Sequence, residues 1–267
     1  MLRHPAFSGS FYPGDPETLR RDVETRLERT GPRTGVTALM APHAGYVYSG
    51  GVAGSTYATA DLPGRLVILG PNHTGRGAPL ALYGDGEWET PLGRMPVDTD
   101  LAGRLQKACP LLEADVEAHS REHAIEVQLP FLQVCAPGAR IVPVCVGTPR
   151  ITDLRALGAA LARVISSLEE PAAILISSDM THHESREVAE RQDRKALETL
   201  ERVEATALYE VVKRERISMC GVYPAVAALE ACRQLGARSG EILAYATSGD
   251  VTGDFSSVVA YAGMHFH

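Results

Sequence analysis

The chain has 267 residues, of which 45% are hydrophobic and 22% are charged, a balance that excludes global disorder and allows a large buried core. Its 33 acidic residues outnumber its 26 basic ones, and the net charge of −7 excludes a broad basic surface for nucleic acid. The apolar runs fall well short of the ~20 residues that cross a bilayer. With no apolar signal segment at its start, the chain is expected to be cytoplasmic and to make no membrane contact.

Short apolar runs bounded by glycine and proline predict buried β-strands along the whole chain. In chain order these strands cover residues 36–41, 66–69, 141–146, 172–176, 242–247 and 258–262. Pro143 weakens the third of them, because proline is disfavoured in a central strand.

Helical spacing of apolar residues lies between these runs. The predicted helices cover residues 98–107, 125–132 with a kink at Pro130, 152–168 with Thr152 or Asp153 as its cap, 184–202 on the surface, and 222–236. Strands that alternate with helices predict an α/β fold with a central, mostly parallel sheet flanked by helices. No shift in composition divides the chain, so we predict a single domain over residues 1–267.

The five cysteines are an odd number, and no pair has CxxC spacing. A disulfide framework is therefore not expected, and most of the thiols are expected to be small buried groups. Cys220 differs because it lies at the start of a predicted helix. A helix N-terminus lowers the pKa of a thiol and favours the thiolate, which binds metals or attacks electrophiles. The alternative for Cys220 is a buried small side chain.

Histidines follow three of the predicted strands. His43 follows the first strand, His73 follows the second, and Asp179 and His182 follow the fourth. Because ligands bind at the carboxyl edge of an open parallel sheet, we expect these side chains to lie at one rim. His43 and His73 are the best candidates for metal ligands, since two imidazoles and one further donor suit a transition metal. The alternative for each histidine alone is a capping or core hydrogen-bonding role.

Asp179 and His182 are expected to work as a pair, with the carboxylate orienting the imidazole and His182 acting as a general acid or base. The alternative is that Asp179 or Thr181 caps the following helix. His123 is a further candidate for the same cleft, its alternative being a structural role. The remaining histidines, His4, His119, His265 and His267, have no supporting context and are expected on the surface.

Six motifs carry a family resemblance. In chain order they are RHPAFSGSFYPGDPETL, APHAGYVYSGGVAGSTYA, VILGPNHTG, SREHAIEVQLPFL, ISSDMTHH and MCGVYP. Together they resemble the Memo family, whose bacterial and archaeal members include the AmmeMemoRadiSam system protein B group. The family is similar in fold to the class III extradiol ring-cleaving dioxygenases, which are non-haem Fe(II) enzymes.

The resemblance implies a set of site residues. His43 and His73 stand where the dioxygenases have two histidine ligands, His182 stands at their acid/base histidine, and Asp179 accompanies it. Cys220 falls where the dioxygenases place a carboxylate ligand. A thiolate is softer than a carboxylate and shifts the preference toward copper, zinc or iron, so dioxygenase activity does not carry over. We expect a transition metal at this site, with iron or copper before zinc.

These observations predict a metal-binding protein with a redox or metal-handling role. The enzyme class that fits this prediction is a metal-dependent, dioxygenase-like oxidoreductase. His43, His73 and Cys220 would hold the metal, and His182, Asp179 and His123 would act on a small molecule or peptide in the rim cleft, partly lined by Tyr46 and Tyr48. A radical-SAM system partner is implied by the resemblance alone. One alternative is a peptide- or protein-binding module with a vestigial active site. Another is a hydrolase that uses Cys220 as nucleophile with His43 or His182.

Overall fold

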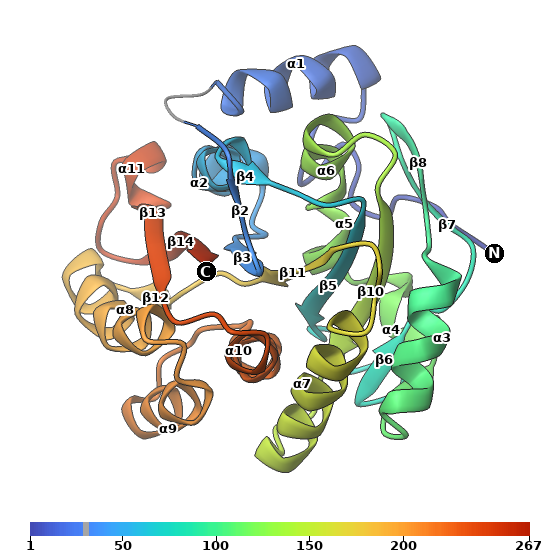
Figure 1. The fold of residues 1–267 in the computed structure, drawn as a ribbon. Helices are drawn as coiled ribbons and strands as arrows, with labels where there is room; N and C mark the ends of the chain where they lie inside the picture. Colours follow the sequence, from blue (N-terminus) through green and yellow to red (C-terminus); the bar gives the residue numbers. More distant parts are fainter. Residues whose placement is uncertain (29–31) are drawn as a thin grey trace.

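A computed structural model describes residues 1–28 and 32–267 (Figure 1). Its largest sheet has the strand order β12-β14-β3-β11-β5-β10-β6-β9, with β13 paired to β14. The bounds of these strands are β3 Ala38–Ala41, β5 Arg65–Pro71, β6 Leu80–Leu82, β9 Glu113–Ala114, β10 Arg140–Val146, β11 Ala172–Ser177, β12 His182–Glu184, β13 Gly240–Thr247 and β14 Val258–Phe266. The four central strands β3, β11, β5 and β10 are parallel. Antiparallel pairs flank them on both sides, so the α/β fold is confirmed and the whole sheet is mixed.

Helices cover both faces of this sheet (Figure 1). Their bounds are α1 Pro16–Arg26, α2 Tyr46–Ala58, α3 Thr99–Ala108, α4 Glu117–Ser120, α5 His123–Glu126, α6 Leu129–Cys135, α7 Ile151–Ile165, α8 Arg186–Glu201, α9 Ala205–Glu215, α10 Val222–Gln234 and α11 Gly249–Thr252. Along β5, Val67 and Leu69 join one core with α7 and α10, whereas Leu66 and Ile68 join a second core with α2 and α6. Burial on both faces explains why the central strands are continuous apolar runs.

Small strands lie outside the main sheet. β1 (Leu2–Arg3), β7 (Glu87–Thr90) and β8 (Gly93–Pro96) form a three-stranded sheet, and β2 (Thr34–Gly35) pairs with β4 (Ala60–Asp61). Among residues 1–28 and 32–267, no helix has the length and apolar content needed to cross a membrane.

The six predicted strands are all present as β3, β5, β10, β11, β13 and β14. Pro143 is tolerated within β10 because the neighbouring β6 pairs only with residues 144–146, and the carbonyl of Pro143 still accepts from the Tyr83 amide. The helix predicted over 125–132 is instead two short helices, α5 and α6. Pro130 lies in the first turn of α6, where its missing N–H costs no helical hydrogen bond.

Two predicted helix caps are wrong. The helix α7 starts earlier than expected, with Arg150 at its N-cap, and the Asp153 carboxylate accepts from Thr148 and Arg150 instead of capping. Ser185 caps α8, so neither Asp179 nor Thr181 caps that helix. Five helices within the described residues were not predicted from the sequence: α1, α2, α4, α9 and α11.

Candidate metal centre

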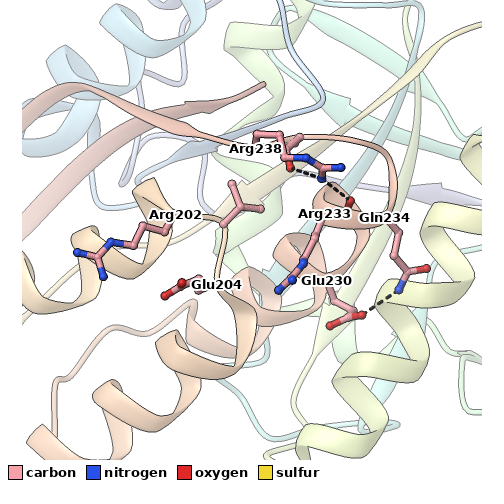
Figure 2. Close-up of a pocket in the computed structure, with 8 residues that line it drawn as sticks. Arg202, Glu204, Glu230, Arg233, Gln234 and Arg238 are labelled. Atoms are coloured by element: carbon pink, nitrogen blue, oxygen red, sulfur yellow. Dashed lines mark hydrogen bonds between the residues drawn. The ribbon is translucent and has the colours of Figure 1, made fainter.

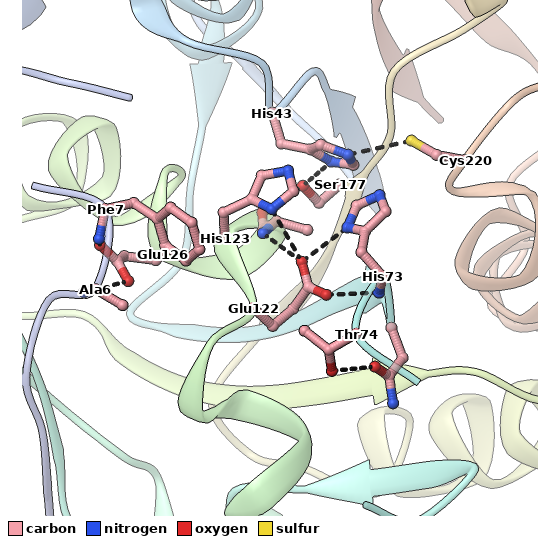
Figure 3. Close-up of polar contacts among 12 residues, drawn as sticks. Ala6, Phe7, His43, His73, Thr74, Glu122, His123, Glu126, Ser177 and Cys220 are labelled. Carbon is pink, nitrogen blue, oxygen red and sulfur yellow. Dashed lines mark hydrogen bonds and ion pairs between the residues drawn. The ribbon is translucent and has the colours of Figure 1, made fainter. Parts of the chain in front are cut away.

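Side chains of different segments meet where the central parallel strands end. His43 lies two residues after β3, Asp179 two residues after β11, and His73 two residues after β5. Because β11 lies between β3 and β5, these three strand ends are neighbours at one rim. His123 begins α5, and Cys220 lies two residues before α10, so both helices add a side chain to the rim (Figure 3).

Three imidazoles cluster at this rim. The ring centroids of His43 and His73 are 5.1 Å apart, with ring planes at 78°. His123 lies 5.3 Å from His43 and stacks on His73 at 4.6 Å, with the two ring planes only 14° apart. One ring nitrogen from each residue lies within 4.8 Å of the other two. Within residues 1–28 and 32–267, these histidines are the group of three whose donor atoms all lie close enough together to share a metal ion.

A buried hydrogen-bond chain fixes the orientation of His43. The Tyr57 hydroxyl donates to Oε1 of Gln128 (2.7 Å), and Nε2 of Gln128 donates to Oγ of Ser177 (2.8 Å). The Ser177 hydroxyl donates to the Ala124 carbonyl (2.6 Å), which leaves its oxygen as the acceptor for Nδ1–H of His43 (2.9 Å). Because Nδ1 carries the proton, Nε2 of His43 presents a lone pair to the rim.

Glu122 fixes the orientation of the His73 ring. Its carboxylate accepts from the His73 backbone amide (2.6 Å), from Nδ1 of His73 (2.8 Å) and from the Ala124 amide (2.9 Å). Burial raises the pKa of Glu122, but the hydrogen bond and charge of His73 outweigh it and lower that pKa to about 2. In the neutral ring this contact places the proton of His73 on Nδ1, which leaves Nε2 as the acceptor. A carboxylate behind a histidine ligand is a common arrangement in metal sites.

His43 and His123 are held in the neutral form at neutral pH. Burial lowers the pKa of His43 to about 3, and the nearby His73 adds to this effect. Burial also lowers the pKa of His123 to about 4, with His43 contributing. Neutral imidazole is the form that binds metals.

Cys220 contacts this cluster. Its Sγ lies 3.1 Å from Nε2 of His43 and accepts from the Asp179 amide at 3.2 Å. Burial raises the pKa of Cys220 well above its usual value, and the Asp179 carboxylate raises it further. The expected thiolate is therefore not favoured in the metal-free protein, because burial and the Asp179 carboxylate both raise the pKa of the thiol. A bound cation would be needed to stabilise the thiolate.

Asp179 and His182 do not form the expected pair. Nδ1 of His182 contacts the carbonyl oxygens of Met180 (2.8 Å) and Ser218 (3.1 Å), so it carries the proton and Nε2 is the acceptor. The Asp179 carboxylate instead accepts from the His43 amide (2.7 Å), and burial raises its pKa. Main-chain carbonyls, rather than Asp179, orient His182.

His123, Asp179 and His182 all line a cleft of about 520 Å³, together with Phe11 and Tyr48. Tyr46 is absent from it and lines an adjoining cavity of about 430 Å³, which also includes Phe11 and Tyr48. The three side chains expected to act on a bound molecule therefore share one space, and Tyr48 is the predicted aromatic that borders it.

The N-terminal segment forms part of the wall around His123. The rings of Phe7 and Phe11 lie 5.4 Å and 4.6 Å from the His123 ring. Glu126 holds this segment in place, since its carboxylate binds Arg3 and accepts from three further donors, Ala6 N, Phe7 N and the Tyr12 hydroxyl.

Another cavity lies at the far end of α10 (Figure 2). Its volume is about 530 Å³, and Arg202, Glu204, Glu230, Arg233 and Arg238 line it with no imidazole or thiol. Since α10 rises about 1.5 Å per residue, this cavity is roughly 20 Å from the rim. The mixture of opposite charges does not indicate a catalytic site.

Sequence reasoning missed the supporting residues Glu122, Ser177, Gln128 and Tyr57. Glu122 was visible beside His123, but its partner His73 lies 49 residues away. Ser177 and Gln128 read as the end of a strand and part of a helix. Only the fold shows that they belong to the hydrogen-bond chain that orients His43.

Comparison with known proteins gives the family. The sequence model described as Memo-like protein matches residues 3–265. A MEMO1 family protein of Methanopyrus kandleri is 42% identical over 281 residues, covering 100% of this chain and 99% of the relative. A MEMO1 family protein of Aquifex aeolicus is 40% identical over 271 residues, covering 99% of each chain. The names of these relatives give a family and no reaction.

Proposed function

This chain belongs to the Memo family, and we propose that it holds one transition-metal ion at the rim through His43, His73 and Cys220. The observation that carries the proposal is that His43 and His73 both present an Nε2 lone pair, each fixed by a buried partner on Nδ1. The Sγ of Cys220 lies 3.1 Å from Nε2 of His43. Two donors that share one ion lie about 3–4 Å apart, given metal–ligand bonds of ~2.0–2.3 Å, so the spacing of Cys220 and His43 supports their binding one ion.

His123 competes with Cys220 for the place of third ligand. Its nitrogen is within reach of the other two imidazoles, but its ring is stacked nearly parallel on His73. Because a nitrogen lone pair lies in the plane of its ring, two stacked rings do not aim at a shared point. The rings of His43 and His73, at 78°, can converge. This geometry favours Cys220 as ligand and leaves His123 to face the cleft.

The chemical types of the proposed ligands limit which metals can bind. Imidazole and thiolate together suit iron, copper and zinc, and the resemblance to iron enzymes puts iron and copper before zinc. Such an ion, when bound, would activate a molecule coordinated at an open position. A redox or metal-handling role is therefore proposed.

His182 supplies proton transfer in this proposal. Its Nδ1–H is held by two carbonyls, so Nε2 can accept a proton from a small molecule or peptide in the cleft. Asp179 fixes the His43 backbone and the Cys220 sulfur rather than His182. A radical-SAM system partner and a cytoplasmic location stay predictions.

Anaerobic calorimetric titration with Fe(II), Cu(I) and Zn(II) tests the proposal. We expect one-to-one binding by the wild type that weakens at least about tenfold in Cys220→Ser, while His123→Ala changes affinity little. The reverse order would make His123 the ligand and contradict the His/His/Cys assignment. Absence of binding by the wild type would favour a peptide-binding module with a vestigial site.

His182→Gln is the matched control. Its glutamine removes the titrating nitrogen at the cleft but lies outside the three proposed ligands, so metal affinity should be retained. Loss of metal in this variant would make His182 a ligand and contradict its acid/base role.

A further inference from the structure

A second cavity reaches Cys220 from the side of α9 and α10. Its volume is about 270 Å³, and Cys220 is one of its lining residues. The cleft that contains His182 does not include Cys220. The half-buried sulfur-bearing residue is therefore bordered by a space separate from the cleft already described, and that space has its own chemistry.

Two cations border this second cavity. Lys213 and Arg216 both line it and both are exposed. Lys213 donates to the Tyr209 hydroxyl, and neither cation forms an ion pair within the described parts of the chain, 1–28 and 32–267. By contrast, the neighbouring Arg214 is paired with Glu215. The protein has a net charge of −7, so two cations without a carboxylate partner beside one cavity favour an anionic ligand there.

The walls of the cavity are apolar and aromatic. Ile217 and Met219 are buried residues at its floor, and the partly buried Tyr209 and Tyr223 border it. Pockets for drug-sized ligands hold about 300–1,000 Å³, so this cavity suits a smaller body. Cations at an opening above an apolar floor fit a small molecule with one anionic end.

We propose that this cavity admits a small organic carboxylate with an apolar or aromatic body to Cys220, and that Lys213 and Arg216 bind the carboxylate. The inference rests on the proposed function, because it names the substrate class for that centre. Both cations attract the ligand by charge and are therefore specificity residues. Neither is proposed to contact a metal ligand.

Alkylation kinetics on metal-free protein test the charge selectivity. Iodoacetate is anionic and iodoacetamide is neutral, and both transfer a carbon to the Cys220 sulfur with loss of iodide and of the thiol proton. The other four cysteines are buried, and Cys220→Ser identifies the labelled residue. The ratio of the two rates cancels any change in the thiolate fraction, so it reports attraction of the anion alone.

The test variant is Lys213→Met combined with Arg216→Asn. Arg216 has a φ of 56°, and asparagine tolerates this left-handed backbone, so the variant loses charge without backbone strain. We expect the iodoacetate-to-iodoacetamide ratio to fall about fivefold or more, the effect of one to two charges near 4 Å in water. The matched control is Arg214→Gln, which loses one charge on the same helix but does not line the cavity and should keep the wild-type ratio.

Protection by a ligand gives the second readout. Benzoate should slow alkylation of wild-type Cys220 by iodoacetamide, while neutral benzamide should not, and the double variant should lose the protection. An unchanged ratio in the double variant, equal protection by benzamide, or no alkylation of native Cys220 would each overturn the inference.

Metal titration of the same variants separates this inference from the proposed function. The double variant should bind metal as the wild type does. Metal binding with an unchanged alkylation ratio would overturn the carboxylate site alone. A charge-dependent ratio in a protein that binds no metal would overturn the metal centre and keep the cavity as a carboxylate site.

Discussion

The protein contains two cysteine–histidine pairs with opposite surroundings. At the rim, Cys220 lies 3.1 Å from Nε2 of His43, and in the core Cys145 lies 3.5 Å from Nδ1 of His119. The core pair is fully buried, and Nε2 of His119 is already used on the Ala81 carbonyl. The rim pair has His73 and His123 beside it and is bordered by open cavities. Donor types alone do not make a metal site, because lone pairs must also converge and be reachable.

The largest expected effect follows from removing a rim imidazole. His73→Ala should lower metal affinity more than about 100-fold, since one of the three proposed ligands is lost and Glu122 is left without its partner. His119→Gln, the core counterpart, should bind metal as the wild type does. Calorimetry and circular dichroism on both variants check binding and folding together. Wild-type affinity in His73→Ala would contradict the rim assignment.

The next effect concerns the chain that fixes His43. Ser177→Ala removes the acceptor of Nδ1–H, so His43 can switch tautomer and lose its Nε2 lone pair. We expect a loss of metal affinity of about 10- to 100-fold. Nitrogen chemical shifts of the His43 ring in metal-free protein provide an independent reading. A Nδ1–H tautomer that persists in the variant would refute the role of Ser177.

Acid should lower the free energy of unfolding through the histidine of each pair and through His123. The pKa values of His43, His119 and His123 are lowered to about 3, 4 and 4, mainly by burial. Since the unfolded state has a histidine pKa of ~6.5, it takes up protons first as pH falls. Stability is therefore full above pH ~6.5 and decreases by about 1.4 kcal/mol per pH unit for each histidine down to pH ~4.

Urea unfolding of metal-free protein at pH 7 and pH 5 measures this loss. His119→Gln removes the contribution of the core pair and should reduce the slope by about one proton. An identical slope in that variant would show that His119 is already protonated in the fold.

The smallest effect is expected from the core thiol. Cys145→Ala deletes one buried sulfur and should cost about 1 kcal/mol of stability through the cavity left behind. Metal affinity should not change, because the Cys145 sulfur contacts the Ala118 carbonyl and His119 and forms no hydrogen bond with a rim imidazole. A loss of metal binding in Cys145→Ala with the fold intact would erase the distinction between the two pairs.

The sequence predicted the central strands and the meeting of His43 and His73 because both follow from local patterns. Apolar runs marked the strands, and the carboxyl ends of parallel strands necessarily share one edge. The helix α2 escaped notice because its small residues give no apolar stripe. Most of them are buried, and Gly263 of β14 faces Thr56 so closely that a Cβ at Gly263 would clash.

The histidines show where sequence reasoning stops. His119 and His265 were expected on the surface, but each is fully buried and contacts a main-chain carbonyl, Ala81 and Thr56 respectively. Such carbonyls are supplied by the fold and leave no mark on the sequence. The same reason hid the carbonyls that orient His182, so its expected partner Asp179 was wrong.

His43 and Cys220 touch although 177 residues separate them along the chain. A ribosome adds about 5–20 residues per second, so the thiol is synthesised roughly 10–35 s after the imidazole. During that interval, a nascent chain holds histidines without the sulfur they contact in the finished fold. The proposed His/His/Cys centre can therefore be completed only after residue 220 has been synthesised.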